Sequence, residues 1–255
     1  MPSLLAADEP RPFHVIQPAA GGCWVITCDH ASNRIPRALG TLGLPDAEIA
    51  RHIGWDIGAA AVTHGLAARL NAWAILQNYS RLVIDCNRHP GTPGSIPPRS
   101  ENTDIPGNVG LSQADAAQRR TEIFDPYHAA IAAELDARGI SGGVTLYVAM
   151  HSFTPVYDGI PRPMHAAVLY NRYPHLAHAL FQKLAAEPGM IVGDNEPYRV
   201  TDDSDYGVPV HCERRGLPYV ELEIRQDLIA HADGQAEWIE RLARLLPMAA
   251  NEVRT

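Results

Sequence analysis

Two histidines stand where short apolar segments end, which is a position from which side chains of an α/β sheet reach a ligand. His30 follows the segment Trp24–Cys28, and His151 follows Val144–Met150. Open α/β sheets bind ligands beyond the carboxyl ends of their strands. Neutral imidazoles bind zinc readily, and a catalytic zinc site keeps one position open for water. One such histidine is usually an ordinary loop residue, but two of them with an interior glutamate favour a metal site.

That glutamate is Glu223, which lies inside the apolar segment Tyr219–Ile224. A carboxylate in an apolar strand must find a partner, a metal-bound water or a proton. Glu221 lies two residues earlier and so on the same face of a strand. One of the two could be catalytic and the other structural, or both could form a buried network with Arg225.

Short apolar runs rich in β-branched residues alternate with longer helical patterns, which indicates a sheet covered by helices. We expect an α/β fold, a three-layer α/β/α domain with a central mixed, mostly parallel sheet. Strands are expected at Trp24–Cys28, Ala74–Gln77, Leu82–Cys86, Val144–Met150, Ala166–Tyr170, Met190–Val192 and Tyr219–Ile224. Helices are expected at Asp46–Leu70, Ser112–Arg138, Pro174–Ala186 and Gly234–Ala249.

The second of these helices has readable ends, because Ser112 with Asp115 resembles a capping box and Gly139 supplies a stop. The stretch between Cys86 and Ser112 is crowded with proline, glycine and small polar residues and is too long for an ordinary connection. It could be a lid over the site or a plain Ω-like excursion. No repeat or polar linker divides the chain, so we expect one domain over residues 1–255, with its core at about 23–249.

Composition argues against several classes of protein. The formal net charge is −8 and basic residues do not cluster, so nucleic acid is not an expected partner. The cysteines at positions 23, 28, 86 and 212 form no Cys-x-x-Cys pair and are expected to be reduced. No apolar run approaches the ~20 residues of a membrane span, and the first residues lack the order of a signal peptide. We expect a soluble cytoplasmic protein with no membrane partner.

Four polar segments follow one another in an order that resembles the zinc carboxypeptidase and aspartoacylase superfamily, and more closely its N-formylglutamate amidohydrolase branch. In that superfamily a histidine follows the first strand, an Asn-Arg pair ends a later one, a His-Ser pair follows another, and a Glu-x-Arg segment comes last. The corresponding residues here are His30, Asn87-Arg88, His151-Ser152 and Glu223-Ile224-Arg225. The N-formylglutamate branch adds a Ser-Arg and a helical Tyr-His, seen here as Ser80-Arg81 and Tyr127-His128. The resemblance runs from about Val25 to Asp227.

The sequence departs from the superfamily at the second metal ligand. Carboxypeptidases and aspartoacylase use His-x-x-Glu, whereas the third position after His30 is Asn33, a poor zinc ligand. The Gly54-Trp55-Asp56 segment is similar to an Asp-bearing segment of the N-formylglutamate branch, so the resemblance implies Asp56 as the ligand. Asp56 could instead be an ordinary helix aspartate, in which case Asp29 is the next candidate.

The resemblance implies one zinc ion per chain, held by His30, Asp56 and His151. Glu223 would act as general base towards the attacking water and as general acid towards the leaving amine. Arg81 is similar to the arginine that polarises the scissile carbonyl in aspartoacylase, where a fixed cation stabilises the developing oxyanion.

Substrate contacts are implied by the same resemblance. Asn87 and Arg88 resemble the pair that holds the substrate carboxylate, and the planar fork of an arginine suits that anion. His211 and His128 are weaker candidates for contacts with a second carboxylate or the leaving group, and each could instead be structural.

The implied reaction is hydrolysis of a small anionic N-acyl amino acid, with N-formyl-L-glutamate giving formate and L-glutamate in histidine breakdown as the nearest case. The residues themselves indicate at least one carboxylate and leave the acyl group and side chain open. A carboxypeptidase or amidase acting on peptide-like or cell-wall substrates would use the same zinc core. A metal-binding ligand sensor without catalysis would need neither Glu223 nor Arg81. The sequence does not indicate the oligomeric state.

Overall fold

The computed structural model describes residues 3–19 and 21–253. A central sheet has the strand order β1-β3-β2-β6-β11-β9-β10. Its strands are β1 (Phe13–Ile16), β2 (Trp24–Cys28), β3 (Trp73–Gln77), β6 (Leu146–Phe153), β9 (Ala166–Leu169), β10 (Val192–Asp194) and β11 (Tyr219–Arg225). The pairs β1–β3 and β11–β9 are antiparallel, and the other neighbours in this sheet are parallel. The mixed, mostly parallel sheet of an α/β fold is confirmed.

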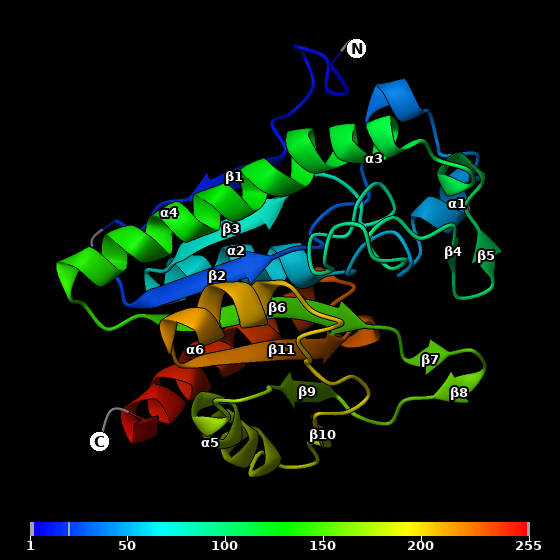
Figure 1. Cartoon of the computed structure of the whole chain (residues 1–255). Coiled ribbons are helices and arrows are strands. Elements are labelled where there is room, and N and C mark those ends of the chain that lie inside the picture. The colour runs from blue at the N-terminus through cyan, green and yellow to red at the C-terminus, as the bar shows by residue number, and fades with distance from the viewer. Residues whose placement is uncertain (1–2, 20, 254–255) are drawn as a thin grey trace.

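Helices cover both faces of this sheet (Figure 1). α2 (Ala59–Leu70), α5 (His175–Ala185) and α6 (Ala232–Val253) pack on one face, and α4 (Asp125–Ser141) packs on the other. Alternate residues of a strand point to opposite faces, so Ile26 joins the apolar cluster beneath α2 and α6 while Val25 joins the cluster beneath α4. Because both faces are covered, β2, β3 and β6 are buried along their whole length.

Most of the predicted strands are found, with ends that move by a few residues. β2 has the predicted bounds, and β6 extends past its predicted end to include His151. β1 was not predicted, because this edge strand is short and half-buried and carries no continuous apolar run.

The predicted strand Leu82–Cys86 is wrong. Its residues are buried, but they form consecutive turns in which Val83 N donates to Ser80 O at 2.9 Å and Arg88 N donates to Asp85 O at 3.3 Å. Periodicity alone does not separate a buried strand from another buried apolar segment. The turns add apolar side chains to the cluster beneath α4 without extending the sheet.

The predicted helix Asp46–Leu70 is two helices, α1 (Asp46–Ile49) and α2 (Ala59–Leu70). Residues 50–58 between them are not helical, and Gly58 there has a φ of 82°, which glycine adopts without a Cβ clash. Asp56 therefore lies in a loop, and the alternative that it is an ordinary helix aspartate is wrong.

The predicted helix at Ser112–Arg138 is longer and less regular than expected. It comprises α3 (Gln113–Arg119), a π-helical turn at 120–124 and α4. The cap is confirmed, since Ser112 Oγ accepts from Asp115 N at 3.1 Å. The helix passes Gly139 and ends at Ser141, where Gly142 caps it with a φ of 70°, so the predicted stop is three residues early. α6 also runs further than predicted, from Ala232 to Val253.

Two small hairpins lie on the side of the sheet where β2, β6 and β11 have their carboxyl ends (Figure 1). They pair β4 (Arg99–Ser100) with β5 (Thr103–Asp104), and β7 (Val156–Tyr157) with β8 (Ile160–Pro161). They touch where Asn102 Nδ2 donates to Asp158 Oδ1 at 2.9 Å. The first hairpin lies in the stretch between Cys86 and Ser112, so that stretch carries secondary structure of its own. Among residues 3–19 and 21–253, no helix has both the length and the apolar character of a membrane span.

Candidate active site

The carboxyl ends of β2, β6 and β11 border a cavity of about 220 Å³. Of the residues singled out by sequence, those that line it are His30, Asp56, Arg81, Asn87, Arg88, His151, Ser152, Glu221 and Glu223. The rest of its wall is His52, Ile53, Ser100, Phe153, Thr154, Tyr157, Tyr198 and Asp205. The cavity thus lies beyond the strand ends, where open α/β sheets bind ligands.

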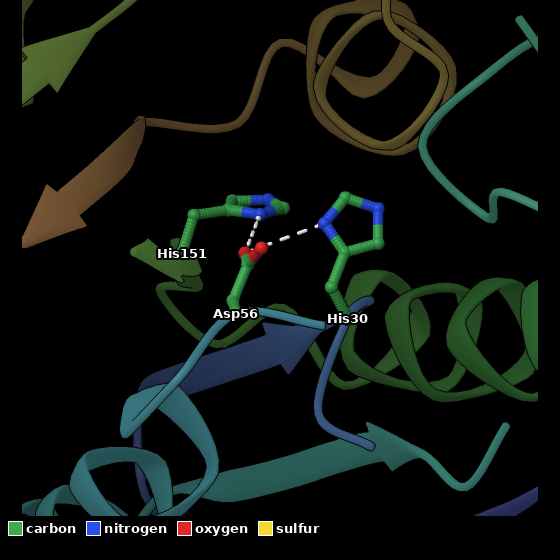
Figure 2. Close-up of side chains that lie close together, drawn as sticks. All are labelled: His30, Asp56 and His151. Atoms are coloured by element: carbon green, nitrogen blue, oxygen red, sulfur yellow. Dashed lines mark hydrogen bonds and ion pairs between the residues drawn. The ribbon is translucent and has the colours of Figure 1, made fainter. Parts of the chain in front are cut away.

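His30, Asp56 and His151, which all line this cavity, point toward one another (Figure 2). One carboxylate oxygen, Asp56 Oδ2, lies 3.3 Å from His30 Nδ1 and 2.9 Å from His151 Nδ1. The loop is held in place because Asp56 N donates to His30 O at 2.9 Å. All three residues are at most 3% exposed, and their ligand atoms lie within 4.8 Å of one another.

The charges around this cluster favour a cation at its centre. Burial opposes ionisation of Asp56, but the two histidines outweigh it and hold the pKa of Asp56 well below its usual range. Burial and Arg81 act to lower the pKa of His30, yet Asp85 and Asp56 raise it above its ordinary value. Burial likewise opposes protonation of His151, but the hydrogen bond to Asp56 and the charge of Glu221 raise its pKa well above the ordinary value. The cluster therefore holds an excess of negative charge that protons or a metal ion can neutralise.

Donor chemistry shows that these residues fit a divalent metal. His30 Nε2 lies 2.8 Å from Asp85 Oδ1, so it carries a proton in the neutral ring and leaves a lone pair on Nδ1. That lone pair faces a lone pair of Asp56 Oδ2, which is unfavourable unless a proton or a cation lies between them. Two imidazole nitrogens and one carboxylate are a ligand set that zinc accepts.

Glu223 and Glu221 form the cavity wall beside the His30, Asp56 and His151 cluster, which is called the metal cluster below for the ion that it could hold. The parallel register of β11 and β6 places Glu223 next to His151 and Glu221 next to Ala149. In each glutamate Oε2 is buried without a hydrogen-bond partner among the described residues. Burial is the main cause that raises the pKa of Glu223 to about 7 and that of Glu221 to about 8. Glu223 is thus a carboxyl group poised to gain or lose a proton near neutral pH.

Arg81 extends into the cavity from the turn after β3. Its Nε and Nη2 donate to Asp85 Oδ2 at 3.0 and 2.7 Å. Its remaining terminal nitrogen, Nη1, lies 3.6 Å from Asp56 Oδ1 and so points towards the metal cluster. An arginine held in this way can place a cation beside a carbonyl that approaches the cluster.

Arg88 and Asn87 also line the cavity and are held by the segment at 204–207. Arg88 Nη1 donates to Asp205 Oδ1 at 2.9 Å and to Ser204 O at 2.7 Å. Nη2 and Nε of Arg88 form no hydrogen bond with the described part of the chain, so they remain free for an anion. The amide of Asn87 is partly engaged, since Oδ1 accepts from Gly207 N at 2.9 Å and one hydrogen of Nδ2 is donated to Asp205 at 3.3 Å.

His128 and His211 do not line this cavity. They stack on each other outside it, with 2.9 Å between His128 Nδ1 and His211 Nε2, and border a separate open hollow. His128 Nε2 donates to Cys86 O at 2.8 Å, which fixes its tautomer. The structure therefore favours the structural role for both histidines over the predicted contact with substrate.

The alternative metal ligands also lie elsewhere. Asp29 is buried on the α4 side of the sheet, where it accepts a short hydrogen bond from Tyr127 Oη. Asn33 is half-buried and does not line the cavity. Asp56 is thus the carboxylate that the fold brings to His30 and His151.

The sequence matches a known protein family over most of its length. Residues 22–230 match the sequence profile of the family described as N-formylglutamate amidohydrolase. The chain belongs to the N-formylglutamate amidohydrolase family. No curated protein matched the sequence.

Two crystal structures resemble this family member over nearly their whole length. The gene product Atu2144 from Agrobacterium tumefaciens has a TM-score of 0.95 and 34% sequence identity, with 99% of this chain and 100% of that chain covered. N-formylglutamate amidohydrolase from Ralstonia eutropha JMP134 has a TM-score of 0.72 and 19% identity, with 96% and 99% covered. At that lower identity the likeness to the second protein shows the shared fold.

Sequence reasoning gave no role to several residues that surround the site of this N-formylglutamate amidohydrolase family member. Asp85 was visible in the segment that contains Asn87 and Arg88, but the strand predicted there gave it no partner. Asp205 lies in an irregular segment without a periodic pattern. Tyr157 and Tyr198 form part of the cavity wall, and Arg162 lies over both rings at 4.7 and 4.8 Å from their centroids. Such contacts depend on tertiary packing and leave no local signal.

Proposed function

We propose that this chain is a zinc-dependent hydrolase that cleaves the amide bond of an N-acyl acidic amino acid, with N-formyl-L-glutamate as the first substrate to test. The observation that carries the proposal is that one cavity holds the His30, Asp56 and His151 cluster together with Glu223. A zinc ion bound by these three residues would supply Lewis acidity and make water a nucleophile near neutral pH. The products would be formate and L-glutamate.

Glu223 moves the proton in this proposal. It lies beside His151 on the neighbouring strand, and Oε2 is free of other hydrogen bonds among the described residues. From that position it accepts a proton from the attacking water and returns it to the departing amine nitrogen. Since that amine leaves as a neutral group, the returned proton is what allows the C–N bond to break.

Two arginines orient the substrate. Arg88, with its free Nη2 and Nε, takes the substrate carboxylate by two parallel hydrogen bonds. Arg81 Nη1 faces the metal cluster and donates to the carbonyl oxygen as negative charge develops on it. Asn87 has one amide hydrogen beyond its bond to Asp205, and that hydrogen can support the same carboxylate.

The test is formate release from N-formyl-L-glutamate by purified protein of known zinc content. N-acetyl-L-glutamate, N-formylglycine and a dipeptide with a carboxyl-terminal glutamate report on the acyl group, the side chain and peptidase activity in turn. We expect N-formyl-L-glutamate to be the best of these substrates. Faster cleavage of the dipeptide would show a carboxypeptidase, and no cleavage of any substrate by the zinc-loaded protein would contradict the proposal.

A further inference from the structure

Asp85 contacts both halves of the proposed machinery without reaching the cavity itself. It is 3% exposed and is absent from the cavity wall, so a substrate cannot touch it. Its Oδ1 accepts from His30 Nε2 at 2.8 Å and from Asn87 N at 2.8 Å. Its Oδ2 accepts from Arg81 Nε and Nη2 at 3.0 and 2.7 Å. Four donors from three residues therefore meet on one buried carboxylate.

The contact with His30 selects the nitrogen that can bind a metal. A carboxylate only accepts hydrogen bonds, so Nε2 of His30 must carry the proton. Nδ1 then has the lone pair, and it is Nδ1 that lies 3.3 Å from Asp56 Oδ2 in the metal cluster. A carboxylate behind a metal-binding histidine fixes the ring and raises its basicity.

The contact with Arg81 fixes the orientation of its guanidinium group. Nε and Nη2 each donate to Asp85, which fixes the guanidinium plane, and Nη1 is the nitrogen that makes no bond to this carboxylate. That atom lies 3.6 Å from Asp56 Oδ1, on the side of the metal cluster. The same carboxylate thus sets the separation between a metal ligand and the cation proposed for the carbonyl.

We propose that Asp85 is the positioning residue of this site, which prepares His30 to bind the metal through Nδ1 and holds Arg81 for the carbonyl. This inference rests on the proposed function. It predicts that the effect of Asp85 on metal binding runs through His30, whereas its effect on turnover at saturating metal runs through Arg81.

Asp85→Asn tests the inference, because an amide has a single acceptor oxygen for the four donors. If the amide nitrogen of the variant faces His30 Nε2, the imidazole ring must change tautomer. If the amide nitrogen faces Arg81, two hydrogen-bond donors meet with no acceptor between them. In both orientations the charge behind His30 is lost. We expect zinc affinity, measured by competition with a chromophoric chelator and without substrate, to fall by about 10- to 100-fold. At saturating zinc, kcat should remain below that of the wild type.

Glu213→Gln is the matched control for loss of a buried carboxylate that pairs with an arginine. Glu213 is 7% exposed, accepts from Arg172 and from Tyr219 Oη, and lies outside the active-site cavity. This control should keep wild-type zinc affinity.

Arg81→Met should also keep wild-type zinc affinity, and the double variant Arg81→Met with Asp85→Asn should bind zinc as weakly as Asp85→Asn alone. Recovery of zinc affinity in the double variant would show that Asp85 only balances the charge of Arg81.

A measurement on the wild type keeps the inference testable even if Asp85→Asn does not fold. In the zinc-loaded protein, two-dimensional ¹H–¹⁵N spectra of the histidine rings should show His30 bound through Nδ1, with a protected proton on Nε2. Zinc bound through Nε2, or a folded Asp85→Asn protein with wild-type zinc affinity, would overturn the inference while leaving the proposed function intact. A wild type that does not bind zinc would refute both.

Discussion

Replacing Glu223 with glutamine separates proton transfer from metal binding at this site. The change keeps the size of the side chain and removes its capacity to take up and return a proton. His30, Asp56 and His151 are untouched, and no hydrogen bond to Oε2 is lost, since that atom has no partner among the described residues. Zinc content should therefore stay near that of the wild type.

The expected loss of rate is large. A positioned general acid–base group is worth roughly 10²- to 10⁴-fold in rate, or about 3–5 kcal/mol of activation free energy. We expect kcat on N-formyl-L-glutamate to fall by at least the smaller factor with a modest change in KM. Glu221→Gln, two residues away on the same face, should be much milder and serves as the matched control.

The same substitution should stabilise the metal-free protein. Burial first of all raises the pKa of Glu223 from 4.5 to about 7. Because this carboxyl ionises at a lower pH in the unfolded chain than in the folded protein, the free energy of unfolding falls as the pH rises from 4.5 to about 7. At about 1.4 kcal/mol per unit the cost above pH 7 is at most about 3 kcal/mol. Glutamine does not ionise, so Glu223→Gln should resist urea better than the wild type above pH 7.

The assay pairs zinc content, steady-state kinetics and urea unfolding of the metal-free protein for both variants. The expected result is that Glu223→Gln has wild-type zinc content, a strongly reduced kcat and greater resistance to urea. If Glu221→Gln is inactive while Glu223→Gln is nearly normal, the catalytic carboxylate is assigned to the wrong residue. If Glu223→Gln loses zinc, Glu223 is itself a ligand and the assignment of Asp56 fails.

Three further outcomes are expected. A chelator should remove about one zinc ion per chain together with the activity, and added zinc should restore both; full activity in metal-free protein would contradict the zinc site. Arg88→Lys should raise KM roughly 10- to 100-fold with kcat nearly kept, because one ammonium cannot replace a two-point clamp, and unchanged kinetics would contradict the clamp. Burial, and after it the charge of Arg215, lowers the pKa of His211 from 6.5 to about 3. Because the unfolded chain then takes up the proton first, the free energy of unfolding should fall by up to about 5 kcal/mol as the pH drops from 6.5 to about 3. His211→Gln should flatten this dependence, whereas the exposed control His175→Gln should not; the opposite pattern in urea titrations would refute the assignment.

The sequence by itself determined the elements that obey a local period or a local cap. β2 has the predicted bounds because five consecutive apolar or small residues fit a strand buried on both faces. Ser112 caps its helix because the capping bond joins residues three apart in sequence. The sequence also placed His30 and Glu223 at one edge of the sheet, since the carboxyl ends of parallel strands meet there.

Tertiary structure alone decided which of several similar residues enter the site. Asp29 is next to His30 in sequence, yet its carboxylate accepts a hydrogen bond from Tyr127. Asp56 reaches both histidines because it lies in the loop between α1 and α2 and not in a continuous helix. Asp85 became a partner of His30 and Arg81 because the apolar segment that contains it forms turns and not a strand. A period in the sequence sets the face on which a side chain lies, but contacts between distant segments are set by where loops bend. Those bends follow from packing against the rest of the fold, and no local pattern records them.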